Sequence, residues 1–153
     1  MNATEIIPGL WQSGWPDDPA WFAAHGVRQV VNLVPDAQGL GYWGSAVPPY
    51  PKGTDVHRWH FLDIPGSVPP PGWIDEISAC VVDCLGRGPV LVHCSAGNNR
   101  STVAVASALC RLNGWSGAEA LAAVRAKRDV RPAPEWVAAL AAWSVLEPNG
   151  GIA

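Results

Sequence analysis

The segment from Val90 to Ser101 constrains the fold more than any other part of the sequence, because it requires a strand, a tight loop and a buried helix in direct succession. Residues 89–93 are apolar enough for a short strand in a sheet interior. Residues 94–99 are small or polar, and residues 103–112 are apolar almost all round, as in a helix buried on most sides. A loop that opens such a helix presents its backbone amides at the helix N-terminus, where anions bind.

The loop after this strand has the composition of a cradle for one tetrahedral phosphate. Its amides can curl inward around an anion, the helix N-terminus adds about half a positive charge, and Gly97 permits the tight turn. The planar fork of Arg100 can donate two hydrogen bonds to phosphate oxygens. We expect these residues to bind the phosphate group of a substrate: Ser95, Ala96, Gly97, Asn98, Asn99 and Arg100.

Cys94 lies at the floor of this predicted cradle. The helix dipole and Arg100 favour its thiolate, which is a nucleophile at neutral pH. Ser101 is close enough in sequence to donate to the sulfur and to stabilise it as a leaving group. A thiolate needs no general base, so we expect His93 to support the loop through its ring nitrogens. The alternative, a buried structural thiol beside a helix-capping arginine, does not account for the whole pattern.

A phosphate ester also needs an acid that protonates the departing oxygen. Asp63 is the predicted acid, because it follows a predicted strand at 56–62 and opens a loop with proline and glycine that is able to close over the cradle. Asp55 and Asp36 are rival candidates. A solvated turn or a helix cap is the structural alternative for Asp63.

The remaining pattern predicts strands alternating first with helices and then giving way to a run of helices. This order indicates an α/β three-layer sandwich with a short, mainly parallel central sheet flanked by helices. We expect a single domain over residues 1–153, with a long variable loop at 35–54, and we expect Gly86 and Gly88 to end the second helix. Further strands are predicted at 10–13 and 27–34, and helices at 18–25, 73–85, 117–127 and from Pro134 onward.

The motif His93-Cys94-x5-Arg100-Ser101 resembles the signature of the protein tyrosine phosphatase superfamily, and its surroundings resemble the small dual-specificity branch. Residues 7–11, 26–33 and 131–136 carry the wider resemblance. It implies a cysteine-dependent phosphatase acting on phosphotyrosine, with phosphoserine and phosphothreonine as further substrates, and an aspartate acid at the place of Asp63. Two features depart from the family pattern: Asn99 is larger than the usual residue, and the loop lacks the lysines that accompany inositol-lipid specificity.

Composition argues against several partners. A net charge of −3 with only two lysines disfavours a protein that grips nucleic acid through many phosphate contacts. No run approaches the roughly 20 apolar residues of a membrane helix, so no membrane partner is expected. The first residues lack the pattern of a secretory signal, which predicts a cytoplasmic location.

The cysteines outside the loop fit ordinary buried thiols. Cys80 and Cys84 are four apart in a helical pattern, and Cys110 lies in a very apolar stretch. A zinc site would need a second ligand pair nearby, and His57 and His60 point to opposite faces of a predicted strand. The sequence therefore predicts neither a metal nor any other cofactor.

Several interpretations stay open. Asn32 is interpreted either as a brace of the loop or as ordinary strand packing, and Tyr42 and Trp43 either as a rim of the cleft or as packed surface. The substrate is a phosphorylated protein or a small phosphorylated molecule, with inositol phosphates, nucleotides and RNA 5′-phosphates as the non-protein alternatives. Two other functions compete, namely phosphate binding without turnover and the chemistry of a sulfur transferase or arsenate reductase.

Overall fold

A central five-stranded sheet organises the chain. The computed structural model describes residues 1–34, 48–59 and 66–146. The strands lie in the order β1-β2-β5-β3-β4; β1 runs antiparallel to β2, and the other neighbouring pairs are parallel. Their bounds are β1 (Ala3–Ile7), β2 (Leu10–Ser13), β3 (Gln29–Asn32), β4 (Asp55–Arg58) and β5 (Val90–His93).

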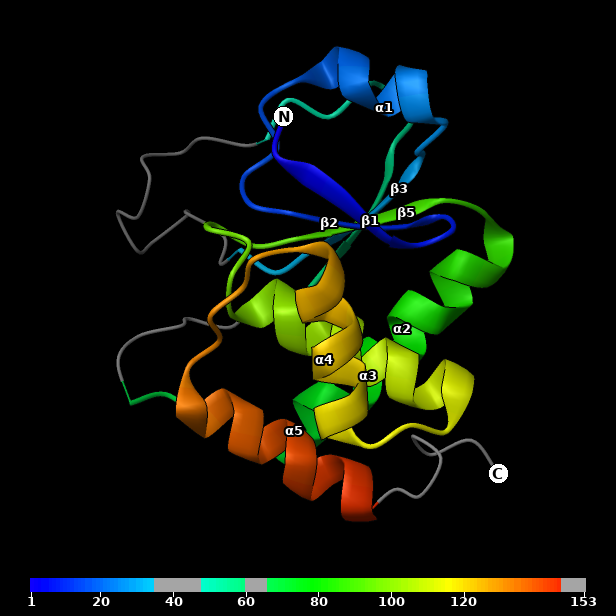
Figure 1. The fold of residues 1–153 in the computed structure, drawn as a ribbon. Coiled ribbons are helices and arrows are strands. Elements are labelled where there is room, and N and C mark those ends of the chain that lie inside the picture. The colour runs from blue at the N-terminus through cyan, green and yellow to red at the C-terminus, as the bar shows by residue number, and fades with distance from the viewer. Residues whose placement is uncertain (35–47, 60–65, 147–153) are drawn as a thin grey trace.

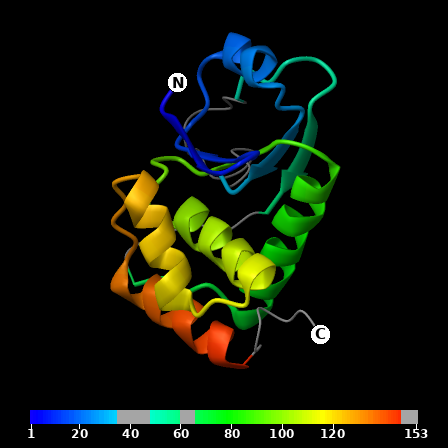
Figure 2. The same ribbon diagram turned by 45° about the vertical axis from the view of Figure 1, so that its right-hand side comes forward.

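Helices cover both faces of this sheet. α1 packs on one face, and the other four helices lie on the opposite face (Figures 1 and 2). This arrangement confirms the predicted three-layer sandwich with a mainly parallel sheet. The helices are α1 (Pro19–His25), α2 (Pro71–Arg87), α3 (Arg100–Asn113), α4 (Gly117–Lys127) and α5 (Pro134–Leu146).

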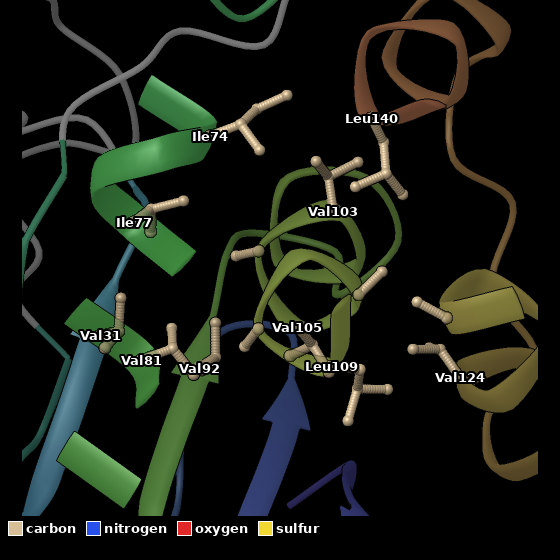
Figure 3. Packing of buried hydrophobic residues seen from close by; sticks show 14 of the residues in the cluster. Val31, Ile74, Ile77, Val81, Val92, Val103, Val105, Leu109, Val124 and Leu140 are labelled. Carbon is tan, nitrogen blue, oxygen red and sulfur yellow. The ribbon is translucent and has the colours of Figure 1, made fainter. Parts of the chain in front are cut away.

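The larger core surrounds α3. Every residue of this helix from Arg100 to Cys110 is buried, which confirms the prediction for most of the apolar stretch 103–112, although Leu112 at its end is 40% exposed. Figure 3 shows α3 between Ile77 of α2 on one side and Val124 and Leu140 of the later helices on the other. A helix enclosed in this way holds the loop at its N-terminus in a fixed position relative to the sheet.

The smaller core lies under α1. Trp21 and Phe22 of α1 pack with Val30 of β3 and Leu91 of β5. Asp18 accepts a hydrogen bond from Ala20 N over 3.0 Å and so caps this short helix. β5 is therefore covered on both faces, which agrees with its unbroken apolar sequence.

The expected end of α2 was confirmed for one of its two glycines. Gly88 is the C-cap of α2, whereas Gly86 lies inside the helix, which continues to Arg87. A glycine inside a helix costs only about 1 kcal/mol, and neighbouring Leu85 packs against the core. The sequence also did not predict β1, an edge strand with only Ile6 buried, which leaves little apolar alternation to detect. Within the described residues, no helix is both long enough and apolar enough to cross a membrane.

Candidate active site

The loop from 94 to 99 joins the middle strand of the sheet to the buried helix. β5 pairs with β2 and β3, so both neighbours hold the strand that delivers Cys94. Trp15 N donates to Ser95 O over 2.8 Å, which ties the loop to the end of β2. Gly97 has φ +73°, and a Cβ there would lie 2.6 Å from Gly14 N. Only glycine fits this position without movement of the backbone.

Cys94 is almost fully buried at the base of the loop, with 2% of its surface exposed. Its Sγ lies 3.3 Å from Gly97 N, which donates to it, and 3.3 Å from Ser101 Oγ. The strand end, the loop amide and the start of α3 thus meet at the sulfur. The Gly97 amide points its hydrogen at the sulfur, so the loop itself provides a donor to Cys94.

Gln12 on β2 completes the contacts of Ser101, and the sequence analysis did not single it out. Its Nε2 donates to Ser101 Oγ over 3.1 Å and to Thr102 Oγ1 over 2.9 Å. An amide nitrogen can only donate, so Ser101 accepts from Gln12, and its own hydrogen stays available for a bond to the Cys94 sulfur. The signal in the sequence was a polar glutamine inside the short strand predicted at 10–13.

Arg100 is the first residue of α3 and is 7% exposed. Its Nη1 donates to Leu33 O over 2.9 Å, just beyond β3, and its Nη2 donates to Ser95 Oγ over 3.2 Å. The guanidinium is therefore anchored at one end to the sheet and reaches the loop at the other. This placement sets its charge beside the loop amides.

Three backbone amides of the loop have no hydrogen-bond acceptor within the part of the chain that the structure describes. In residues 1–34, 48–59 and 66–146, no hydrogen-bond acceptor is found for the backbone N–H of Ser95, Ala96 or Asn98. These amides lie at the N-terminus of the 14-residue helix α3. An anion at this place would receive hydrogen bonds and the favourable helix dipole together.

The side chains of the two loop asparagines serve a different purpose from their amides. Asn98 Oδ1 accepts from Arg131 N over 3.2 Å, and Asn99 Oδ1 accepts from Ala133 N over 2.9 Å. The unusually large residue before Arg100 is thus explained by its bond to the segment that leads into α5. The two bonds fix the outer wall of the loop.

Arg128 is a second cation that the sequence analysis missed. It is 8% exposed, and its Nε donates to Gly97 O over 3.2 Å. Its Nη1 donates to Thr4 Oγ1 over 3.1 Å, which links the loop to β1. Burial lowers the pKa of Arg128, and the charge of nearby Cys94 opposes this effect. Arg128 therefore holds the loop through the carbonyl of Gly97, whereas Arg100 contacts the side chain of Ser95.

This architecture matches solved structures of known proteins. No protein-family model matches the sequence, and no curated protein does. Solved structures do match. Human DUSP28 has a TM-score of 0.79 at 21% identity over 95% of both chains. The human tyrosine phosphatase-like serine/threonine/tyrosine-interacting protein has a TM-score of 0.80 at 19% identity, over 94% of this chain and 96% of its own.

PTPMT1 in complex with PI(5)P matches with a TM-score of 0.78 at 19% identity, over 94% of this chain and 95% of its own. The chain has the dual-specificity phosphatase fold. The similarity extends over nearly the whole of each chain, so the fold includes both the sheet and the helical layer.

Within the dual-specificity phosphatase fold of this chain, His93 holds the backbone of Cys94. His93 Nδ1 lies 3.3 Å from Cys94 O, and its Nε2 lies 2.6 Å from the Tyr50 hydroxyl. A carbonyl can only accept, so Nδ1 carries the hydrogen and Nε2 accepts from Tyr50. Burial lowers the pKa of His93 to about 4 and raises that of Tyr50. Both side chains are therefore neutral at neutral pH.

The predicted acid Asp63 lies outside the described residues, as do Asp36, His60, Tyr42 and Trp43. Asp55 is described, and it pairs with Gln29 at the start of β3. Gln29 also pairs with Val90, the first residue of β5, whereas Cys94 follows the last residue of β5. Asp55 and Cys94 therefore lie at opposite ends of the strands. Among the acid candidates, the fold thus separates Asp55 from the loop.

Among the described residues, the Asn32 side chain makes no direct bond to the loop at 94–99. It is buried at the end of β3, and its Oδ1 accepts from Val34 N over 2.9 Å. This bond shapes the turn that carries Leu33, whose carbonyl anchors Arg100. Asn32 therefore supports the loop indirectly, through the turn at Leu33 and the Arg100 side chain.

Proposed function

We propose that the chain is a cysteine-dependent phosphatase that hydrolyses phosphate monoesters through a phosphocysteine intermediate. Its proposed substrates are phosphotyrosine, phosphoserine and phosphothreonine on proteins, and one catalytic domain spans residues 1–153. The observation that carries the proposal is the position of Cys94 Sγ, 3.3 Å from both Gly97 N and Ser101 Oγ beneath the loop that Arg100 flanks.

In the first step, the amides of the loop and Arg100 hold the phosphate oxygens. The Cys94 thiolate attacks phosphorus, the S–P bond forms, and the bond from phosphorus to the ester oxygen breaks. Asp63 gives its proton to the departing oxygen. The positive charge that stabilises the transition state comes from Arg100, the loop amides and the N-terminus of α3, in positions set before the substrate arrives.

In the second step, water attacks the phosphocysteine. The Asp63 carboxylate takes a proton from the water, the new O–P bond forms, and the S–P bond breaks. Ser101 donates to the sulfur as its negative charge returns, and the bond from Gln12 keeps that hydroxyl in place. The arrangement supports a two-step reaction because the leaving sulfur has its own donor.

The substrate class is tested by a turnover assay with chelator present throughout. The panel contains phosphotyrosine, phosphoserine and phosphothreonine peptides, inositol phosphates and RNA 5′-phosphate ends, with release of inorganic phosphate as the readout. We expect turnover of the phosphotyrosine peptides at least. Turnover confined to inositol phosphates or RNA ends would move the substrate class away from proteins.

The covalent mechanism is tested by Cys94→Ser. A serine hydroxyl is not ionised at neutral pH, so the variant should lose turnover of an aryl phosphate while vanadate still binds. Activity near that of the wild type would overturn the proposal. Phosphopeptide binding without turnover by the wild-type protein would instead indicate a phosphate-binding module.

A further inference from the structure

A second cluster of reactive side chains lies where α2 passes the edge strand β4. Cys80 and Cys84 come from α2, and His57 comes from β4. One potential ligand atom from each residue lies within 4.8 Å of the others. Asp55 pairs with Gln29, the first residue of β3, and Gln29 Nε2 donates to Cys84 O. Asp55 and Cys84 therefore lie near the N-terminal ends of these two strands. The cluster lies on the edge strand β4, which β3 separates from β5, the strand that leads to Cys94.

The spacing of the two cysteines suits joint binding of one ion. Residues four apart on a helix lie on the same face, and pairs of this spacing bind zinc from helices in other proteins. Zinc bonds to sulfur at about 2.3 Å and to nitrogen at about 2.0 Å, which separates tetrahedral ligand atoms by about 3.5–3.8 Å. Cys80 is only partly buried, so a rotation of its side chain can close the remaining gap.

His57 supplies a nitrogen at this place, beside the carboxylate of Asp55. Its Nε2 is shielded from solvent, and within the described residues it makes no hydrogen bond, although Asp55 Oδ2 lies 3.2 Å away. Asp55 is two residues from His57 on the same strand, so both side chains project from the same face. Its carboxylate is 57% exposed and can move to become a fourth ligand.

We infer that His57, Cys80 and Cys84, with Asp55 as the fourth ligand, form a zinc site that joins β4 to α2. Two thiolates and an imidazole are soft ligands that select zinc over calcium or magnesium. Arg87 lies 3.5 Å from Cys84 Sγ and pairs with Asp83, and its positive charge offsets the surplus negative charge of the ligands. The site is structural and independent of the phosphatase proposal.

A disulfide between the two cysteines does not fit this geometry. Side chains four apart on a helix have Cβ atoms about 5–6 Å apart, whereas a disulfide requires about 3.5–4.5 Å. Both residues lie inside α2, which continues to Arg87, so a disulfide would require part of that helix to unwind. Binding of one ion between the two sulfurs leaves the helix intact.

The test is a cobalt titration of the full chain after removal of bound metal, followed by displacement with zinc. We expect one equivalent of cobalt to give the visible bands of a tetrahedral site and a thiolate-to-cobalt charge-transfer band, and zinc to abolish both. Cys80→Ser and His57→Ala should lose these bands. Cys110→Ser is the matched control, since it removes a buried thiol in α3 outside the cluster and should keep them.

Thermal unfolding provides a second readout for the same proteins. Zinc should raise the Tm of the wild type and of Cys110→Ser but not that of Cys80→Ser, because a ligand that binds only the folded state stabilises it. Cys80 is partly exposed, so its substitution spares the packing that Cys84→Ser would disturb. Absence of the tetrahedral spectrum in the wild type would overturn the proposal. A spectrum that persists in Cys80→Ser and disappears in Cys94→Ser would overturn it too, by assigning the metal to the phosphate loop.

Discussion

The side-chain amide of Gln12 donates to Ser101 Oγ over 3.1 Å, and this bond determines where the serine hydrogen can point. Ser101 Oγ is 3.3 Å from the Cys94 sulfur, so a residue on β2 controls the hydroxyl that faces the proposed nucleophile. Gln12 touches neither the substrate nor the reacting sulfur in the proposed reaction. It is a positioning residue for the second step, in which the sulfur leaves.

Replacing Gln12 with leucine should lower kcat more than KM for an aryl phosphate. Ser101 loses the partner that directs its hydrogen to the sulfur, and Gly97 O loses the bond from Gln12 but keeps the bond from Arg128 that holds the loop. Phosphocysteine should accumulate, so rapid-mixing measurements should show a burst of the aryl product before the slow steady state.

Gln29→Leu is the matched control for that substitution. Gln29 is another buried glutamine on a strand, but its Nε2 donates to the carbonyls of Cys84 and Gly88, away from the loop. This control should lower the Tm and leave kcat of the folded protein unchanged. Equal losses of kcat in both variants would mean that Gln12 acts only through stability.

Arg100→Lys should cost about 2–4 kcal/mol of transition-state stabilisation, the size of the loss of a preorganised donor. Lysine cannot span from Leu33 O to the loop with a planar fork, as Arg100 does. The measurement is kcat/KM for an aryl phosphate, with circular dichroism to verify folding. An unchanged kcat/KM would show that Arg100 does not contact the phosphate.

Asp63→Asn should lower kcat by about 10²–10⁴-fold for a poor leaving group such as a tyrosyl phosphate, because the variant has no proton to donate. The loss should shrink for an activated leaving group. The pH profile of the wild type should be bell-shaped, and the variant should lose the descending alkaline limb. If that limb persists, another residue is the acid, and Asp36 is the next to test.

The stability of the protein should fall as the pH falls from about 6.5 to about 4, because of His93. Burial lowers the pKa of His93 to about 4, from 6.5 in the unfolded chain, so in this window the unfolded chain binds the extra proton. Above pH 6.5, His93 contributes about 3 kcal/mol to the free energy of unfolding. This contribution is lost as the pH falls to about 4.

Urea unfolding at a series of pH values measures this dependence. His93→Asn has no group that titrates there, so its stability should change less over the same window. Tyr50→Phe removes the donor to Nε2 and should lower stability at neutral pH, while the histidine still titrates. The same slope in His93→Asn and in the wild type would assign the acid sensitivity to other groups.

The sequence by itself determined the features that depend on neighbouring residues. The order of apolar strand, polar loop and apolar helix around Cys94 is contiguous, so it predicted β5, the tight loop after it and the burial of α3. The start of α4 is local in the same way: Ser116 and Glu119 are three positions apart, the spacing of a capping box, and Ser116 Oγ accepts from Glu119 N. Local hydrogen bonds and short-range periodicity suffice for such features, because both partners lie within a few positions of each other.

Only the tertiary structure decided which distant residues meet. Gln12 reaches Ser101 across 89 positions, and Arg128 reaches Gly97 across 31. His57 meets Cys80 and Cys84 because β4 and α2 pack together. Neither the spacing nor the periodicity of the sequence predicts these contacts. The contacts depend on the order of the strands in the sheet and on which helix faces pack against the strands.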